Sequence, residues 1–384
     1  MNTDLSYNNR KVRFIALYLP QFHPIPENDE WWGKGFTEWT NVAKAKPLFK
    51  GHYQPKVPSD LGFYDLRMPE IREQQAQLAK EAGIEGFCYW HYWFGNGRRL
   101  LERPFNEVVS SGKPDYPFCL CWANHSWSNK TWKLSKSRME NNNLLMEQLY
   151  PGEEDYKNHF YALLDAFRDK RYIQVDGKPV FFIFSPDFPE VSAFINLWRQ
   201  LAKENGLGDF HFVAMLYSAN LRSNSSVKER IDHIMSLGFD AVNTIGNTKA
   251  EREAGLFKTY FHAVWDKVFK TPTLIKYKQS VINKHMFSEE DKLEYVYPTV
   301  MPNWDRSPRC GKSCVIYTDS TPEVFEKHVE DAINLVKDKE PEHKIVAIRS
   351  WNEWGEGNYL EPDLKYGHGY LDAIKSAVSK INDK

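Results

Sequence analysis

Short apolar runs alternate with amphipathic segments along almost the whole chain. Residues 345–348 (IVAI) contain no polar position, which is typical of a parallel strand covered on both faces. By contrast, Ile71, Leu78 and Ala82 recur at helical spacing before Gly83, which predicts a helix over residues 68–83. The same patterns predict strands at residues 13–19, 84–94, 116–123, 178–185, 210–216, 239–244, 295–300 and 345–348. Further helices are predicted at residues 98–112, 153–170, 189–205, 227–238, 322–339 and 370–381, with one or two more within 251–292.

Eight predicted strands thus alternate with about eight helices, and no flexible linker or change in composition divides the chain. We therefore predict an α/β fold, a single (β/α)8 barrel of the TIM type that spans residues 1–384 as one domain. A minimal barrel needs only about 250 residues, so the surplus is expected in long loops after strands one, three and six. The residues that follow each strand should then meet at one rim of the barrel, where such folds carry their chemistry.

The stretch after the last predicted strand changes character abruptly. Residues 351–357 (WNEWGEG) combine Glu353 and Glu356 with two tryptophans and two glycines. If the backbone turns there, both carboxyl groups can reach one small molecule, while like charge and burial under indole rings separate their pKa values. One protonated and one ionised carboxyl group suit cleavage or transfer of a glycosidic bond. The alternative is that this Glu-x-x-Glu spacing, common on solvated helix faces, has no catalytic meaning.

Aromatic and polar residues also gather at the ends of other predicted strands. Planar aromatic rings stack on sugar faces, and a few polar groups hydrogen-bond sugar hydroxyls, so these residues are candidates for substrate binding. The alternative is that about half of them pack in the core and that Glu38 caps a helix. The candidates are Tyr18, Gln21, His23, Glu38, Trp39, Trp90, His91, Tyr92, Trp122, Asn124, His125, Asp305, Arg306, Trp351, Asn352 and Trp354.

Composition narrows the classes of partner. The chain has 50 Lys and Arg residues against 51 Asp and Glu residues, so no overall field favours nucleic acid or an anionic membrane. The 13 Trp, 20 Tyr and 24 Phe residues suit a sugar-binding cleft. No segment approaches the roughly 20 apolar residues of a membrane span, and the N-terminus has no apolar leader. Together with five cysteines that lack a disulfide-framework spacing, this predicts a cytoplasmic protein with reduced thiols.

Several catalytic signatures are missing from the sequence. There is no G-x-x-x-x-G-K-[ST], no G-x-G-x-x-G after a strand, no H-E-x-x-H and no G-x-S-x-G. Asp-x-Asp, which many nucleotide-sugar glycosyltransferases use to hold a metal, does not occur either. We therefore predict no cofactor and no metal site, and an oligosaccharide or polysaccharide as the partner.

Two stretches carry a resemblance to a known family. SWNEWGEG, residues 350–357, resembles the signature of glycoside hydrolase family 99, the endo-α-mannosidases and endo-α-mannanases. IALYLPQFHPIPENDEWWGKGFTEWTNV, residues 15–42, is similar to the WbsX-like proteins of bacterial surface-polysaccharide biosynthesis. The resemblance implies that Glu353 is the base that acts on the sugar 2-hydroxyl and that Glu356 is the general acid/base. The hydrolases typically have His where this chain has Gly355.

Three functions follow from these observations. The first is a retaining, metal-independent enzyme that acts on a glycosidic bond of a bacterial surface polysaccharide or its precursor through Glu353 and Glu356. The second is a glycosyltransferase or transglycosylase in O-antigen or capsule assembly, which the predicted cytoplasmic location favours. The third is a non-catalytic glycan-binding barrel, because a shared fold does not establish turnover.

Overall fold

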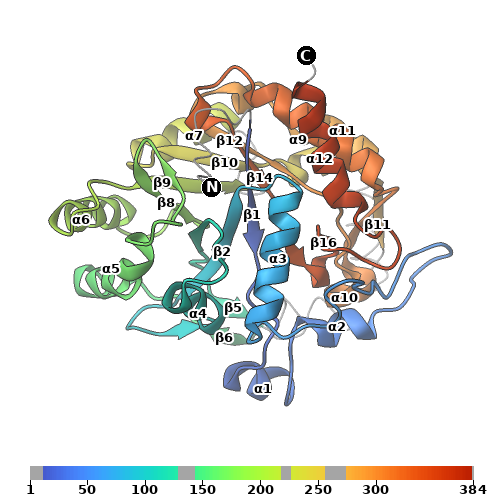
Figure 1. The fold of residues 1–384 in the computed structure, drawn as a ribbon, viewed down its shortest axis with the longest axis horizontal. Coiled ribbons are helices and arrows are strands. Elements are labelled where there is room, and N and C mark those ends of the chain that lie inside the picture. The colour runs from blue at the N-terminus through green and yellow to red at the C-terminus, as the bar shows by residue number, and fades with distance from the viewer. Residues whose placement is uncertain (1–11, 129–142, 218–225, 256–273, 383–384) are drawn as a thin grey trace, which may run out of the picture.

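The computed structural model describes residues 12–128, 143–217, 226–255 and 274–382 of the chain. Within them, eight parallel strands close into a barrel (Figure 1). They are β1 (Arg13–Tyr18), β2 (Gly86–Trp93), β4 (Phe118–Trp122), β8 (Lys178–Ile183), β9 (His211–Tyr217), β10 (Ala241–Ile245), β12 (Val296–Val300) and β14 (Ile345–Ile348).

The first strand closes the barrel. Arg13 of β1 is in register with Ile345 of β14, and Ile15 is in register with Gly86 of β2. Each remaining neighbour also pairs in parallel, so the strand order follows the chain order around the ring. This closed parallel sheet confirms the predicted (β/α)8 barrel.

Helices between the strands cover the outside of the barrel (Figure 1). The start of α11 shows why the sequence folds this way, because the Thr321 hydroxyl accepts a hydrogen bond from the amide of Val324 and Pro322 occupies the first turn. The main helices are α3 (Pro69–Glu81), α4 (Arg103–Ser111), α5 (Glu153–Phe167), α6 (Val191–Glu204), α7 (Val227–Ser236), α11 (Pro322–Val336) and α12 (Gly369–Asn382).

The predicted helix at residues 98–112 begins later than expected. Arg99 and Leu100 form β3, which pairs antiparallel with the end of β2, and α4 starts at Arg103. Pro104 lies in the first turn of α4, where its missing N–H has no intrahelical partner to lose. The helical pattern therefore indicated the element, and the proline marks its start.

Long connections follow strands one, three and six, as predicted. The first contains α1 (Pro26–Trp32) and α2 (Glu38–Lys44), and the second contains β5 (Trp127–Ser128) and β6 (Leu144–Met146). The third includes helical residues 247–255, β11 (Ile275–Lys278), α9 (Gln279–Met286) and a 3-10 turn (Glu289–Lys292). A further one, which was not predicted, follows β12 and carries α10 (Ser307–Cys310), a 3-10 turn (Gly311–Ser313) and β13 (Val315–Thr318), which pairs with β11.

Other features bear on the sequence predictions. All five cysteines are free, and Cys88, Cys119 and Cys121 are buried in barrel strands. Among the helices in the described ranges, none combines the length and apolar character that a bilayer crossing needs. The cytoplasmic location stays a prediction.

Candidate active site

The chain turns sharply after β14 and brings both glutamates to the same place. Asn352 and Glu353 form β15, residues Trp354–Glu356 form a single 3-10 turn, and Asn358 and Tyr359 return as β16 (Asn358–Tyr359) antiparallel to β15. The Ser350 hydroxyl accepts a hydrogen bond from the amide of Glu353 (2.9 Å), and Gly357 takes the left-handed conformation that ends the turn. The segment is therefore a tight hairpin and not a helix face.

One guanidinium connects both carboxylates to a third. Arg309 Nη1 lies 3.0 Å from Glu353 Oε1 and 2.8 Å from Glu356 Oε1, and Arg309 Nη2 donates to Glu38 Oε1 (2.9 Å). Arg309 is 4% exposed, Glu353 8% and Glu356 7%. Arg309 comes from α10 and Glu38 from the start of α2, and both elements pack against the turn that carries Glu356.

The two glutamates differ in their electrostatic surroundings. Burial raises the pKa of Glu353, and the neighbouring charge of Glu356 raises it further. Burial acts in the same direction on Glu356, but Arg306, Arg309 and Arg349 outweigh it and lower the pKa of Glu356. In the free protein, Glu356 is therefore the ionised member of the pair and Glu353 retains a proton more readily.

Two more arginines flank Glu356. Arg306 Nε lies 3.0 Å from Glu356 Oε1, and Arg349 Nη2 lies 4.0 Å from Glu356 Oε2. Arg349 directly follows β14, and its Nη1 donates a hydrogen bond to the hydroxyl of Tyr217 (2.8 Å) at the end of β9. Glu356 thus faces one cation from the connection after β12 and one from the end of β14.

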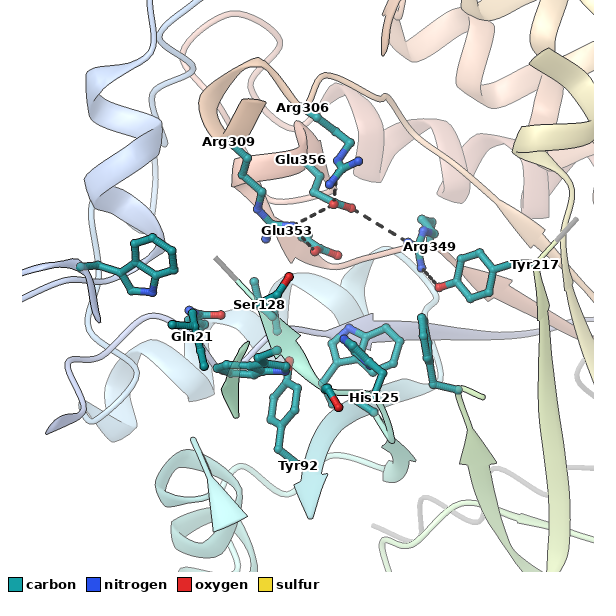
Figure 2. Close-up of a pocket in the computed structure, with 18 residues that line it drawn as sticks. Gln21, Tyr92, His125, Ser128, Tyr217, Arg306, Arg309, Arg349, Glu353 and Glu356 are labelled. Carbon is teal, nitrogen blue, oxygen red and sulfur yellow. Dashed lines mark hydrogen bonds and ion pairs between the residues drawn. The ribbon is translucent and has the colours of Figure 1, made fainter. Parts of the chain in front are cut away.

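These groups line a cleft at the carboxyl end of the barrel. In Figure 2 the carboxylates and arginines lie on one side of the hollow, and Tyr92 and His125 lie on the other. The cavity volume is about 310 Å³, at the lower end of the roughly 300–1,000 Å³ of small-molecule sites. Its lining is Leu19, Gln21, Trp32, Trp90, Tyr92, Ala123, His125, Ser126, Trp127, Ser128, Leu145, Phe184, Tyr217, Arg306, Arg309, Arg349, Glu353 and Glu356.

Seven of the residues predicted from the sequence line this cleft. His125 is exposed at the cleft, where its ring lies 4.8 Å from the ring of Phe184, measured between centroids. The amide nitrogen of Gln21 is buried without a hydrogen-bond partner. The seven are Gln21, Trp90, Tyr92, His125, Arg306, Glu353 and Glu356.

Other predicted residues lie behind the cleft wall in the core. His91 pairs with His159 (2.8 Å), and Trp122 donates to the carbonyl oxygen of Trp93 (2.9 Å). Asn352 fixes the hairpin by two hydrogen bonds with the backbone of Leu19. The structure does not bring these buried side chains into the cleft: Tyr18, His23, Glu38, Trp39, His91, Trp122, Asn124, Trp351, Asn352 and Trp354.

Asp305 and Trp354, two of the predicted residues, lie outside the cleft and contact other parts of the protein. Asp305 lines a second cavity next to it, where His52 (2.9 Å) and Gln54 (2.6 Å) bond its Oδ2. Burial alone would raise the pKa of Asp305, but the bond with His52 and the charge of Lys56 lower it to about 2. Trp354 stacks on Tyr359 at 3.7 Å between ring centroids and donates to Glu361 (2.6 Å), so its indole ring supports the hairpin from behind.

Several residues that line the cleft were not predicted from the sequence, among them Trp127, Phe184, Tyr217, Arg309 and Arg349. A usable signal existed for three of them. Arg349 directly follows predicted strand eight, Tyr217 follows strand five, and Phe184 lies at the end of strand four. Arg309 offered no such signal, because it lies in the unpredicted connection after β12.

Gly355 lies where Glu38 and Arg309 meet. A Cβ atom at residue 355 would stand 1.9 Å from Glu38 Oε1 and 2.9 Å from Arg309 Nε. The space that a side chain would need is therefore filled by this ion pair. This is a physical reason for glycine at residue 355, the position where the resemblance to the family 99 hydrolases would imply histidine.

We expect Gly355→Ala to lower the free energy of unfolding by about 1–3 kcal/mol, because overpacking a buried site forces neighbouring groups to move. Urea unfolding measures this cost. In a Glu38→Ala background the carboxylate is gone, so adding Gly355→Ala should cost much less, and the double-mutant cycle isolates the clash. An equal cost in both backgrounds would show that Glu38 is not the obstacle.

In the part of the chain that the structure describes, no three His, Cys, Asp or Glu side chains are grouped as a metal site.

The family model described as "Glycosyltransferase WbsX" matches residues 14–374. The protein WxcX from two strains of Xanthomonas campestris pv. campestris is 33% identical over 386 residues, which cover 96% of this chain. The chain spans about half the length of these curated relatives, 50% in each case.

Solved structures share the fold. A protein described as a glycoside hydrolase-like protein aligns with a TM-score of 0.61 at 17% identity, over 97% of this chain and 95% of its own. The family 99 endo-α-mannosidase of Bacteroides thetaiotaomicron aligns with a TM-score of 0.55 at 15% identity, over 97% of this chain and 98% of its own. At these identities the likeness establishes the barrel and leaves the reaction open.

Proposed function

Because the chain belongs to the WbsX glycosyltransferase family, we propose that it is an enzyme that makes or breaks a glycosidic bond in a bacterial surface polysaccharide or its precursor. Glu353 and Glu356 are the proposed reacting groups, and residues 1–384 the proposed domain. One observation carries the proposal: a single turn after β14 brings both carboxyl groups onto one guanidinium in an aromatic-lined cleft. Two such carboxyl groups with separated pKa values are the minimal machinery of glycosidic chemistry.

The protonation states bear on the roles of the two glutamates. The resemblance implies that Glu356 is the acid, but three arginines hold Glu356 in its ionised form in the free protein. We propose that Glu356 reacts as the ionised base and that Glu353, whose pKa is raised, supplies the hydrogen-bonding proton. This order is opposite to the one that the resemblance implies.

A second candidate, glycosyl transfer, gains support from the same arginines. Hydrolysis of a glycan needs a proton for the departing sugar oxygen, and in this arrangement Glu353 would have to supply it. Transfer from a donor with an anionic leaving group needs positive charge instead, and Arg306, Arg309 and Arg349 line the cleft. The family description points in the same direction.

The test is a product assay. The purified chain is incubated with an array of α-linked bacterial oligosaccharides, with and without sugar diphosphate donors, and mass spectrometry records both shorter and longer products. Shortening alone supports hydrolysis, and lengthening only with a donor supports transfer. Glycan binding without any product, unchanged in Glu353→Gln, supports the glycan-binding barrel and contradicts the proposed enzyme.

A further inference from the structure

Arg306 and Arg349 form a pair of cations supported by one aromatic ring. The guanidinium carbon of Arg306 lies 5.9 Å from the ring centroid of Trp304, and that of Arg349 lies 5.8 Å from it. Trp304 is 7% exposed, so both guanidinium groups lie against the same buried indole ring. Figure 2 shows both guanidinium groups beside Glu356, on the charged side of the hollow.

Arg349 has spare hydrogen-bonding capacity in a buried position. It is 8% exposed, its Nη1 donates to Tyr217, and its Nη2 stands 4.0 Å from Glu356. Its Nε–H is buried and meets no hydrogen-bond acceptor. A buried guanidinium with unused donors is costly unless an anion completes its shell, and Arg349 lines the cleft that such an anion would enter.

The charge balance of the site also favours an anion. Three arginines face Glu38, Glu353 and Glu356. Burial raises the pKa of Glu38 to about 7, and burial with the charge of Glu356 raises that of Glu353, so part of the negative charge is absent at neutral pH. The nearby Glu251 accepts a hydrogen bond from Tyr317 (2.6 Å), and its pKa is raised by burial as well.

We propose that Arg306 and Arg349 bind the diphosphate of an activated sugar, so that the substrate class of this site is a glycosyl diphosphate donor. This inference rests on the proposed function and names the donor for it. The planar guanidinium fork matches phosphate oxygens in a bidentate way. Arg349 has an unused Nε–H and an Nη2 that stands 4.0 Å from Glu356. The aromatic side of the cleft, with Trp90 and Tyr92, is left for the sugar ring.

The resulting step is balanced without a general acid. The bond from sugar C1 to the phosphate oxygen breaks, and its electron pair leaves on the diphosphate, where the arginines stabilise the charge. A new bond forms between C1 and the hydroxyl oxygen of the acceptor. The acceptor proton passes to the ionised carboxylate of Glu356.

The test measures binding of inorganic pyrophosphate, uridine diphosphate, farnesyl diphosphate and glucuronate by isothermal titration calorimetry. Arg306→Gln and Arg349→Gln should each weaken pyrophosphate binding about tenfold or more, because a charged hydrogen bond is lost. Arg168→Gln, a change at an exposed position after α5, should have no effect. Tighter binding of uridine diphosphate identifies a nucleotide donor, and tighter binding of farnesyl diphosphate identifies a lipid-linked one.

Two results would overturn the inference. One is pyrophosphate binding that is absent, or equal in wild type and both arginine variants. The other is arginine-dependent binding of glucuronate without binding of any phosphate compound, which would indicate an acidic glycan. Arg306 is half-buried, so Arg306→Gln should fold even if Arg349→Gln does not, and thermal unfolding checks both.

This binding test distinguishes failure of the donor inference from failure of the proposed function. If pyrophosphate does not bind but Glu356→Gln abolishes cleavage of a neutral glycan, the donor inference fails and the proposed function stands. If arginine-dependent pyrophosphate binding is found but turnover survives Glu356→Gln, the assignment of the reacting glutamates fails and the anion site stands.

Discussion

Replacing Glu356 with glutamine should lower kcat about 10³-fold or more on the substrate that the product assay identifies, while glycan binding stays within about threefold of wild type. A positioned acid or base contributes roughly 10²–10⁴-fold to such reactions. Glutamine keeps the shape of the side chain but cannot accept or deliver the proton. Steady-state kinetics measure kcat, and calorimetry with the unreacted glycan measures binding.

A comparison of leaving groups then assigns the roles of the two glutamates. If Glu356 is the base, Glu356→Gln should slow substrates with good and poor leaving groups to a similar extent. In Glu353→Gln, poor leaving groups should suffer more, because Glu353 is the group that retains a proton. The opposite pattern, with Glu356→Gln rescued by good leaving groups, would support the acid role that the resemblance implies.

The matched control is Glu154→Gln, an exposed glutamate on α5 that does not line the cleft. It removes the same charge and should leave kcat unchanged. Wild-type turnover in Glu356→Gln would remove Glu356 from the reaction altogether. Thermal unfolding of each variant separates loss of function from loss of fold.

The barrel could be predicted because its strands are covered on both faces. A run such as Ile345–Ile348 shows this directly, since burial on both sides leaves no polar alternation. The connection after β12 could not be predicted in the same way. Its α10 has only four residues, and β13 is stabilised by pairing with β11, about forty residues earlier in the chain.

The sequence pattern does not show which residues at a strand end face the inside of the barrel. In β2, Trp90 and Tyr92 point into the cleft, whereas His91 and Trp93 point outward and contact His159 and Asp155 of α5. Successive side chains on a strand point to opposite faces, so half of an aromatic run must leave the site. Both faces of this strand are covered by protein, and the sequence pattern therefore did not tell which half faces inward.

The contacts that complete the charged cluster are also invisible in the sequence. Arg309 reaches Glu38 across 271 positions of the chain. Neither residue belongs to a repeated pattern, and Glu38 was predicted as a substrate contact or a helix cap. In the structure it begins α2 and faces Arg309 from within the protein, so it positions the arginine that both reacting glutamates share.

Arg309→Gln should lower the free energy of unfolding by about 3–5 kcal/mol, the usual cost of removing one partner from a buried ionic network. Arg309 is the group that contacts Glu38, Glu353 and Glu356 together. Without it, three buried carboxyl groups lose their shared counterion, and urea unfolding at pH 7 measures the loss. Arg309→Lys should be intermediate, because an ammonium group keeps the charge but lacks the planar fork.

The stability loss expected for Arg309→Gln should also depend on pH, in a direction that follows from the pKa shifts. In the wild type the arginines lower the pKa of Glu356. This lowered pKa stabilises the folded state at pH values above the ordinary carboxyl range, and the stabilisation is lost as the pH falls. In Arg309→Gln the pKa values of the three carboxyl groups should rise, so the folded state takes up protons that the unfolded state has released. The stability deficit should therefore be larger at pH 8 than at pH 5.

A matched control lies at the other end of the barrel. Arg199 bonds Asp209 and Asp240, each at 2.7 Å, but its side chain is 21% exposed. Arg199→Gln removes an arginine with two carboxylate partners, and solvent should limit its cost to about 1 kcal/mol. Equal losses in the two variants, or a deficit in Arg309→Gln that does not change with pH, would contradict the view that burial of the three glutamates makes Arg309 indispensable.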